Sequence, residues 1–595
     1  MLKVIAMKRT KEQIERLIRG ALGEIKADMV ITGGKLVNVY SGELLAGMEV
    51  AVLDGRVCYV GPSAAHTRGS ETEHIDATGL VIAPGFIDAH THISHFCRPY
   101  EYLEAYLAHG TTALITTCDE LASVFGFEGV KLFLAEVERH PTRVFTMLSM
   151  AAPQDPLVCN TRSFSQAEVA EALADPRILG LGEVVSWVRL IERDPQILER
   201  LEMAWREGKM IDGHTAGARD QKLCAIAAAG VSSCHEPISE EDALQRLRTG
   251  YWVMLREGSF RRDLEATLKP FVNDGVNPQR LILVTDSKGP DDIAREGYLD
   301  FVVRRAIRLG LPPIQAIQAV TLNAATYCGL DRDIGGIAPG RYADLVLLED
   351  LEEARVHSVY IGGKVAAQAG GTLTVKDPIS FPAEVFHSLR VDRPITPESF
   401  RIRCSLPSVK IRVMELLNLN ITVERILKQS PRSGALEADP DQDLMKVAVF
   451  DRHGTTGKIV FGFLKGLGAR VGAIGTTSNL DENTLLVAGS DDQDMATCAN
   501  LLLQTGGGMA VVDHGEILAR LDFPVGGIFS LDPWPVVGEG LTRIHRCLRE
   551  RGSRFPKSIY ALCFLTFATL PALRITARGL VAVKGRKIVP LIVED

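Results

Sequence analysis

Pro84-Gly-Phe-Ile-Asp-Ala-His-Thr-His92 follows directly on the apolar run Leu80-Val-Ile-Ala83. This near-continuous hydrophobicity is typical of a parallel strand covered on both faces, and it predicts a buried strand that ends at two histidines. Side chains at positions i and i+2 of a strand point the same way, so His90 and His92 can bind one metal ion. The motif alone is weak evidence, and two hydrogen-bonded core histidines are the alternative.

Seven further apolar runs of strand length follow this one, separated by polar, periodic stretches that predict covering helices. The eight strands and their helices predict an α/β fold, a (β/α)8 barrel, in which chemistry is placed at the carboxyl ends of the strands. The further strands are expected at 112–117, 144–150, 178–184, 209–214, 230–235, 251–256 and 281–286, and helices at 167–173, 196–207, 240–249 and 261–273.

Four of the later strands end in a residue type that binds metals. These residues are Glu183, His214, His235 and Asp286. With His90 and His92 they make four histidines and two carboxylates, a donor set that suits Zn²⁺, Mn²⁺ or Fe²⁺. A carboxylate such as Glu183 can bridge two ions, so the pattern favours a site for two divalent ions, with one ion as the fallback.

Net charge and cysteine spacing argue against several classes of partner and framework. The chain has 595 residues, 46% of them hydrophobic, a net charge of −8 and a pI near 6.0. This charge gives no reason to expect nucleic-acid or membrane-surface binding and favours a small-molecule substrate. The eleven cysteines lack paired CxxC spacing, which argues against a zinc knuckle or a secreted disulfide framework. The first residues have too short an apolar core for a signal peptide, so a cytoplasmic location is expected.

The pattern of helical stretches, short β runs and turn dipeptides predicts that the chain has four parts. An N-terminal helical segment, 1–27, carries an amphipathic packing helix at 10–24. Short β runs with turn dipeptides predict a small β-sandwich domain from 28–83 plus 336–376, split by the inserted barrel, 84–335. Residues 377–595 predict a C-terminal α+β domain. Its most apolar stretch, 559–570, is expected to be a core helix, since about 20 residues are needed to span a bilayer.

Motifs along nearly the whole chain resemble the adenine deaminase family of the amidohydrolase superfamily. They are Val39-Tyr-Ser-Gly42, the 84–92 stretch, His109-Gly-Thr-Thr112, Gly180-Leu-Gly-Glu183, Asp212-Gly-His214, Ser232-Ser-Cys-His-Glu236, Arg256-Glu-Gly-Ser259, Val284-Thr-Asp286, Ala338-Pro-Gly-Arg-Tyr-Ala-Asp344, Gly506-Gly-Gly-Met-Ala-Val-Val-Asp513 and Leu573-Arg-Ile-Thr-Ala-Arg-Gly579. The resemblance implies that all six ligands carry over, with two divalent ions per chain, Mn²⁺ or Fe²⁺ and Zn²⁺ as a further candidate. It also implies hydrolytic deamination of adenine to hypoxanthine and ammonia.

The chain departs from the family's pattern beside the ligands. Ser94 stands where the family usually has Glu, Asp119 where it has His, Cys234 where it has Asp, and Gly289 near a usual His; the family's histidines around 481–483 are also missing. His95 is expected to be a mobile loop histidine, and Cys234 a small packed residue. The departures keep two other functions open: an amidohydrolase for another cyclic amide or amidine ring, and a non-catalytic protein that retains the fold and the metal site.

Aromatic deamination needs a nucleophile, a proton for the ring and a proton for the leaving amine. Asp286, at the end of the last strand, is the expected general base. Glu236 is the expected proton donor to the ring, by analogy with the non-ligand glutamate of other deaminases; a salt bridge on its loop is the alternative. The C-terminal domain has three open roles: it caps the barrel mouth, it forms the interface of a homodimer, or it does both.

Overall fold

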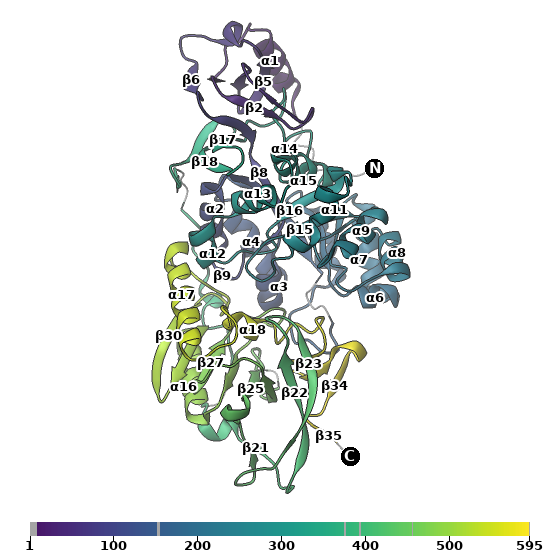
Figure 1. The fold of residues 1–595 in the computed structure, drawn as a ribbon, viewed down its shortest axis with the longest axis vertical. Coiled ribbons are helices and arrows are strands. Elements are labelled where there is room, and N and C mark those ends of the chain that lie inside the picture. Colours follow the sequence, from purple (N-terminus) through teal and green to yellow (C-terminus); the bar gives the residue numbers. More distant parts are fainter. Residues whose placement is uncertain (1–8, 151–154, 374–376, 392–393, 455, 594–595) are drawn as a thin grey trace.

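The computed structural model describes residues 9–150, 155–373, 377–391, 394–454 and 456–593. Its chain is arranged in three parts along the long axis: small sheets at one end, the barrel in the middle and the C-terminal part at the other end (Figure 1). Within the described residues, no helix combines the length and the apolar character needed to cross a membrane.

The helix α1 (Lys11–Ala21) begins at a capping box, in which Thr10 and Gln13 satisfy each other's backbone amides. Leu17 packs against the neighbouring sheet. The expected packing face is only partly correct, because Ile14, Ile18 and Leu22 are exposed.

Two sheets enclose a separate apolar core near the N-terminus. Their strands come from both sides of the barrel in the sequence, and β7 (Val81–Pro84) pairs with β17 (Leu345–Asp350) in antiparallel register, Val81 opposite Leu348. The first sheet has the order β5 (Arg56–Gly61), β4 (Glu49–Leu53), β1 (Met29–Thr32), β6 (Glu73–Asp76); the second has β20 (Gly371–Thr372), β19 (Lys364–Gln368), β18 (Arg355–Ile361), β17 (Leu345–Asp350), β7 (Val81–Pro84), β2 (Lys35–Asn38), β3 (Glu43–Leu45).

The apolar run before the histidines therefore belongs to this small sheet and is not the start of the barrel strand. The chain passes from β7 to β8 at Gly85, where a Cβ atom would lie 2.1 Å from Thr112 Oγ1. This close packing leaves room only for glycine, and it divides one apolar stretch into two strands of different sheets.

All eight expected barrel strands are present. Five form one parallel sheet and three another, and the backbone amide of Asp286 closes the ring on the carbonyl of His90 at 3.1 Å. In chain order the strands are β8 (Phe86–His92), β10 (Thr111–Thr117), β11 (Arg143–Ser149), β12 (Ile178–Val184), β13 (Met210–Gly213), β14 (Ser233–Cys234), β15 (Trp252–Arg256) and β16 (Leu281–Val284).

Helices cover the outside of the barrel, including those expected near 167, 196 and 240. The prediction of a helix at 261–273 is only partly confirmed. The chain forms two short helices within this range, and Pro270 lacks the amide hydrogen that a continuous helix would use. The helices are α2 (Pro99–Ala108), α3 (Asp119–Phe125), α4 (Phe127–Val137), α5 (Gln166–Ala174), α6 (Trp187–Ile191), α7 (Pro195–Arg206), α8 (Asp220–Ala228), α9 (Glu240–Arg248), α10 (Leu264–Thr267), α11 (Lys269–Asn273), α12 (Pro290–Glu296), α13 (Leu299–Arg308), α14 (Pro313–Ala319) and α15 (Leu322–Tyr327).

The C-terminal part is built on one mixed sheet with helices against it. Its strand order is β23 (Thr422–Gln429), β22 (Val409–Leu416), β26 (Ile459–Lys465), β25 (Leu444–Phe450), β28 (Leu486–Gly489), β27 (Ala473–Thr476), β29 (Gly508–Asp513), β30 (Glu516–Asp522), with β35 (Ile592–Val593) on β22. The helices α16 (Asp492–Gln504) and α17 (Trp534–Glu550) join this sheet in the α+β arrangement that the sequence predicts, and β32 (Leu573–Thr576), β33 (Gly579–Ala582) and β34 (Lys587–Val589) form a further small sheet.

The C-terminal part is tied to the barrel beside the carboxyl ends of the barrel strands. The strand β31 (Phe529–Ser530) pairs with β9 (Phe96–Cys97), which follows the first barrel strand. Lys557 Nζ lies 2.5 Å from Asp291 Oδ2 and 2.6 Å from Asp292 Oδ2 on α12. These contacts place residues of the C-terminal part over the barrel mouth.

The long core helix expected at 559–570 is wrong in extent. The helix α18 covers only Ile559–Cys563. Beyond it, the buried guanidinium of Arg574 donates hydrogen bonds to the carbonyls of Phe564 and Leu570, both at 3.0 Å. Beyond Cys563 the backbone forms turns, in which Phe567 N–H donates to Phe564 O and Leu570 N–H to Phe567 O, so the segment is a buried, irregular stretch at the barrel mouth.

Candidate metal centre and pocket

The six predicted ligands converge at the carboxyl ends of the barrel strands. His90 and His92 lie at the end of β8, and Glu183 is the second-last residue of β12. The other three ligands follow their strands within two residues: His214 after β13, His235 after β14 and Asp286 after β16. Asp286 adopts a left-handed backbone conformation with φ of 49°, which Asp tolerates better than most residues and which turns the chain at the strand end.

Hydrogen bonds from outside the cluster orient the first two histidines. His90 Nδ1 donates to Asp212 Oδ2 at 3.0 Å, and His92 Nδ1 lies 2.9 Å from Thr117 Oγ1. Such partners fix the ring and leave Nε2 free to bind a metal ion. In both histidines, Nε2 faces the carboxylates of the cluster.

Glu183 lies between two pairs of histidines. Its Oε1 is 3.6 Å from His90 Nε2 and 3.3 Å from His92 Nε2. Its Oε2 is 2.5 Å from His214 Nδ1 and 3.2 Å from His235 Nε2. Each oxygen of Glu183 therefore faces a different pair of histidines, as expected for a carboxylate that bridges two ions.

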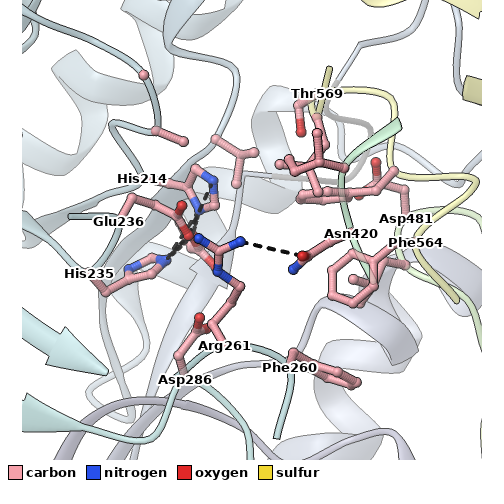
Figure 2. Close-up of a pocket in the computed structure, with 18 of the residues that line it drawn as sticks. His214, His235, Glu236, Phe260, Arg261, Asp286, Asn420, Asp481, Phe564 and Thr569 are labelled. Atoms are coloured by element: carbon pink, nitrogen blue, oxygen red, sulfur yellow. Dashed lines mark hydrogen bonds and ion pairs between the residues drawn. The ribbon is translucent and has the colours of Figure 1, made fainter. Parts of the chain in front are cut away.

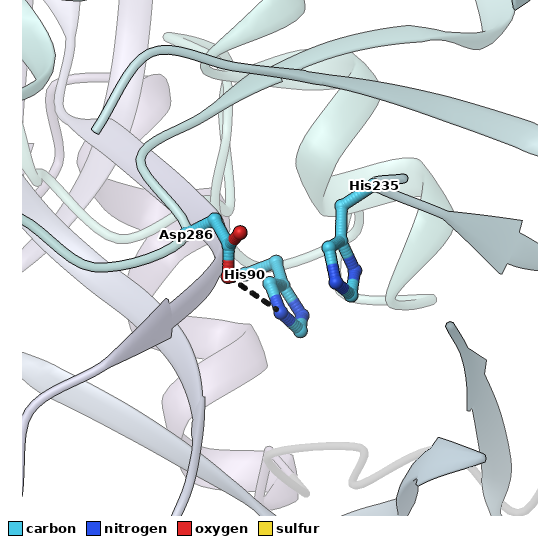
Figure 3. A group of neighbouring side chains, drawn as sticks. All are labelled: His90, His235 and Asp286. Carbon is cyan, nitrogen blue, oxygen red and sulfur yellow. Dashed lines mark ion pairs between the residues drawn. The ribbon is translucent and has the colours of Figure 1, made fainter. Parts of the chain in front are cut away.

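Asp286 completes the cluster on the side of His90 and His235, as Figure 3 shows. Its Oδ1 lies 3.6 Å from Nε2 of both His90 and His92. Its Oδ2 accepts a hydrogen bond from Arg256 Nη1 at 2.8 Å. The carboxylate thus contacts the cluster with one oxygen and an arginine with the other.

The electrostatics of the cluster favour cations. Burial alone would raise the pKa of Glu183 and of Asp286, but the neighbouring histidines, joined at Asp286 by Arg256, outweigh it and hold both well below their usual range. Burial would lower the pKa of His90, but the neighbouring carboxylates of Asp212, Asp286 and Glu183 raise it well above its usual value. Two ionised carboxylates in a buried site attract positive charge, whether protons or metal ions.

The residues fit a divalent metal. Ligand atoms of His90, His92 and Glu183 lie within 4.8 Å of one another, as do those of Glu183, His214 and His235. His90 Nε2 is buried and, within the described ranges, has no hydrogen-bond partner, as expected for an atom reserved for an ion. Imidazole nitrogens and carboxylate oxygens suit Zn²⁺, Mn²⁺ and Fe²⁺ alike.

Arg256 connects the two carboxylates for which the sequence predicts catalytic roles. It ends β15 and ion-pairs with Glu236 and Asp286 through Nη1, while its Nε lies 3.0 Å from Asp263 Oδ2. Sequence reasoning missed this residue because arginine is not a metal ligand, although its place at a strand end was the available signal. The salt-bridge alternative for Glu236 is thus present, and the residue also lines the pocket.

Burial alone would raise the pKa of Glu236, but the charge of Arg256, followed by those of His214 and His235, lowers it to about 2. Its Oε1 lies 3.5 Å from His235 Nε2 and 3.8 Å from His214 Nε2. Glu236 is therefore a carboxylate at neutral pH and stands next to one half of the cluster.

A cavity of about 650 Å³ opens from the cluster, and barrel and C-terminal residues share its wall (Figure 2). Phe260 of the barrel and Phe564 of the C-terminal part meet edge to face with centroids 5.3 Å apart. The sequence left open whether the C-terminal part caps the barrel mouth, and it did not identify which of its residues line the pocket. Its contributions include Asn420, Leu480, Asp481, Asn483, Phe564, Phe567 and Thr569.

Of the four departures within the barrel, Asp119 lines the pocket, and Ser94 lies behind it, against the lining residue Glu120. Asp119 accepts a hydrogen bond from Thr117 Oγ1 at 2.5 Å, and its Oδ2 lies 3.6 Å from His92 Nδ1. Ser94 donates a short hydrogen bond to Glu120. The expectation of a mobile His95 is wrong, because its ring is buried, lines the pocket and lies 2.8 Å from Ser287 Oγ.

The other two departures do not face the cluster. Cys234 is fully buried, and its sulfur accepts a hydrogen bond from Thr215 Oγ1 at 2.9 Å, so the prediction of a small packed residue is confirmed. Gly289 donates its amide hydrogen to Ser259 Oγ at 2.8 Å, where the chain enters α12.

Comparison with known proteins gives matches over both large parts of the chain. Residues 81–366 match the model of the amidohydrolase family, and residues 420–587 match that of the adenine deaminase C-terminal domain. The adenine deaminase of Moorella thermoacetica is 40% identical over 588 residues, 98% of each chain. That of Cenarchaeum symbiosum is 36% identical and covers 98% of this chain and 96% of its own. Among solved structures, the β-aspartyl dipeptidase of Fervidobacterium islandicum AW-1 aligns with 60% of this chain and 99% of its own, with a TM-score of 0.45 and 16% identity.

Proposed function

The chain belongs to the adenine deaminase family of amidohydrolases, and from this premise we propose that it hydrolyses adenine to hypoxanthine and ammonia at the cluster around Glu183. The observation that carries the proposal is the position of Glu183, whose two oxygens each face one pair of histidines inside a cavity large enough for a purine.

We propose that two divalent ions, Mn²⁺ or Fe²⁺, are held by the six ligands. His90 and His92 would hold one ion, His214 and His235 the other, with Glu183 between them and Asp286 beside the first. When bound, such ions lower the pKa of water to about 7 and so supply a nucleophile at neutral pH.

Asp286 is the proposed general base. Its pKa lies well below its usual range, so it is ionised and able to accept the proton of the attacking water. It then returns a proton to the amino group of adenine, which leaves as ammonia. Arg256, 2.8 Å from Oδ2, holds the carboxylate in place through both steps.

Glu236 is the proposed proton carrier for the ring nitrogen. Because it is ionised in the resting protein, it must first accept a proton before it delivers one to the ring. Its position beside His214 and His235 places it near the attacking water as well as the pocket. Arg256 binds Glu236 as it binds Asp286, so one guanidinium positions both carboxylates.

The proposal is tested by incubating the purified protein, loaded with Mn²⁺ or Fe²⁺, with adenine. Loss of adenine absorbance, ammonia release and metal content are recorded on one sample. We expect hypoxanthine and ammonia in equal amounts, and a loss of at least about 10³-fold in kcat for Glu183→Gln, together with lost metal. The exposed hairpin variant His514→Asn is the matched control.

Metal bound without turnover of adenine would contradict the proposed substrate and would favour another cyclic amide or amidine ring. Equal activity of Glu183→Gln and the wild type would contradict the proposed site.

A further inference from the structure

Arg261 lines the pocket and has two N–H groups that none of the described residues uses. It lies in the loop after β15, with 21% of its side chain exposed. A guanidinium carries five N–H donors. Nε and Nη2 donate to the two oxygens of Asp263 at 3.2 and 3.4 Å, and Nη1 donates to Asn420 Oδ1 at 3.3 Å. One N–H on each terminal nitrogen is therefore available to a ligand.

The guanidinium of Arg261 is held on two sides, by the barrel and by the C-terminal part. Asp263 is fixed to the end of the barrel strand, because its backbone amide donates to the carbonyl of Arg256 at 3.2 Å. Asn420 is buried, and its carbonyl accepts a short hydrogen bond from Arg574. Figure 2 shows the bond between Arg261 and Asn420 in the pocket. A donor held in this way loses little freedom when a ligand binds.

The position of Arg261 relative to the metal centre follows from a shared carboxylate. Asp263 Oδ2 accepts hydrogen bonds from Nε of Arg256 at 3.0 Å and from Nε of Arg261 at 3.2 Å. The Nη1 atom of Arg256 in turn donates to Glu236 and Asp286. Arg261 thus lies one carboxylate beyond the proposed catalytic pair, on the side of the C-terminal part (Figure 2). A ring whose reacting atom is at the cluster presents its opposite edge on that side.

The surroundings of Arg261 indicate a flat, neutral ligand. Phe260 precedes it and packs edge to face against Phe564, with centroids 5.3 Å apart, and against Tyr560, at 4.9 Å. Phe260 and Phe564 line the pocket and give it an apolar aromatic surface, which suits a planar ring. Asp263 already balances the charge of Arg261, so the ligand need not be an anion. A neutral ring nitrogen with a free lone pair is a sufficient acceptor.

We propose that Arg261 binds the substrate by donating a hydrogen bond to N3 of adenine. The inference rests on the proposed function, which places the carbon that bears the amino group at the cluster. N3 lies directly across the six-membered ring from that carbon, and it remains an acceptor in the product. A hydrogen bond from a charged donor contributes about 10-fold or more to affinity.

Calorimetric titration of the Mn²⁺-loaded protein tests this contact without requiring turnover. The ligands are hypoxanthine and 3-deazahypoxanthine, in which a C–H group replaces N3, with 7-deazahypoxanthine as the analogue that keeps N3. We expect hypoxanthine to bind at least about 10-fold more tightly than the 3-deaza analogue. In Arg261→Met, which keeps a long apolar side chain but has no donor, the same ratio should fall below about 3.

The kinetic test is the effect of Arg261→Met on adenine deamination. We expect KM to rise at least about 10-fold and kcat to change less than about 3-fold, because Asp263 keeps its bond to Arg256 and the catalytic carboxylates stay in place. Arg262→Met is the matched control. The guanidinium of this neighbouring arginine pairs with Glu296 on α12 at 2.9 Å, and the variant should bind hypoxanthine as the wild type does.

A purely structural role for Arg261, as a link between the barrel and Asn420, predicts a different result. Arg261→Met would then weaken both ligands equally and leave their ratio at the wild-type value, which would overturn the inference. Equal binding of hypoxanthine and 3-deazahypoxanthine by the wild type, or no binding of either, would also overturn it. A wild-type protein that binds hypoxanthine with the expected ratio but does not deaminate adenine would overturn the proposed function and leave the contact with N3 standing.

Discussion

Arg256 contributes to the charge state of both proposed catalytic carboxylates, and at Glu236 it is the main cause. Its guanidinium pairs with Glu236 and Asp286, and both carboxylates have a pKa below the usual range although they are buried. A buried carboxylate without such a partner would tend to be neutral. At this scale, the ionised state of Glu236 depends mainly on a residue that is neither a ligand nor an acid, whereas that of Asp286 depends first on the histidines.

We therefore predict that Arg256→Gln moves the acid limb of the kcat/KM profile to higher pH. Burial raises and Arg256 lowers the pKa of Glu236, so removal of the positive charge raises it from about 2 and the carboxylate is lost at a higher pH than in the wild type. Activity at neutral pH should fall by about 10- to 100-fold, since the variant leaves buried charges unpaired. Arg470→Gln, an exposed pair with Asp441, is the control. An acid limb at the wild-type position would contradict the prediction.

His545 gives a residue-scale prediction for stability. Burial, followed by the charge of Lys557, lowers its pKa to about 3, and within the described chain neither ring nitrogen has a hydrogen-bond partner. In the unfolded chain, His545 binds a proton below about pH 6.5, whereas in the folded chain it binds one only near pH 3. Stability is therefore lost as the pH falls through this window. Between pH 6.5 and 5 the loss is about 2 kcal/mol.

The measurement is urea unfolding of the wild type and His545→Phe at both pH values. The phenyl ring keeps the edge-to-face contact with Tyr560, whose centroid lies 5.0 Å away, and removes the titrating group. The variant should lose about 2 kcal/mol less than the wild type between the two pH values. Parallel losses in both proteins would refute the assignment.

At the scale of elements, strands were predicted more accurately than the segments that cross between parts of the molecule. Each barrel strand is a local apolar run, and its existence is visible in the sequence. The stretch 559–570 is equally apolar, but its helix stops at Cys563, and beyond it the carbonyls of Phe564 and Leu570 accept hydrogen bonds from the guanidinium of Arg574. Local hydrophobicity does not report a hydrogen-bond partner that lies elsewhere in the chain.

The strand that carries Glu183 depends on close approach to its neighbour. A Cβ atom on Gly180 would lie 2.2 Å from the carbonyl oxygen of Met210 in β13, which is backbone and cannot rotate away. We predict that Gly180→Ala lowers the free energy of unfolding by about 1–3 kcal/mol, since overpacking forces the strands apart. Urea unfolding checks this. Gly371→Ala, at an exposed strand position with open space around it, should change stability little.

At the scale of the whole molecule, the pocket exists because the barrel and the C-terminal part share it. The ligands come from the barrel, while Asp481, Asn483 and Phe564 come from the C-terminal part. Of the three roles left open for that part, capping the barrel mouth is the one these contacts support.

The charge of the cluster predicts how metal loading depends on pH. Carboxylates raise the pKa of His90 and His92 well above the usual value despite burial, so protons compete with metal up to a higher pH than at ordinary imidazoles. After the metal is removed with a chelator, addition of Mn²⁺ at pH 8 should raise Tm. At a Mn²⁺ concentration of 100 times Kd, the free energy of unfolding should increase by about 2.7 kcal/mol. The gain should shrink at pH 6. Differential scanning calorimetry measures the Mn²⁺-dependent rise in Tm at each pH, and Glu183→Gln should show little rise at either. An equal rise at the two pH values would contradict competition between protons and metal.

The sequence by itself determined the eight barrel strands, the six residues at their carboxyl ends and the family, because hydrophobic period and strand-end position are properties of neighbouring residues. Only the tertiary structure decided that Arg256 joins Glu236 to Asp286, that the apolar run divides at Gly85 between two sheets, and that Asp481 of the C-terminal part lines the pocket. Those contacts join residues from separate strands or from separate sheets. Their formation depends on how the elements pack, and no local pattern records it.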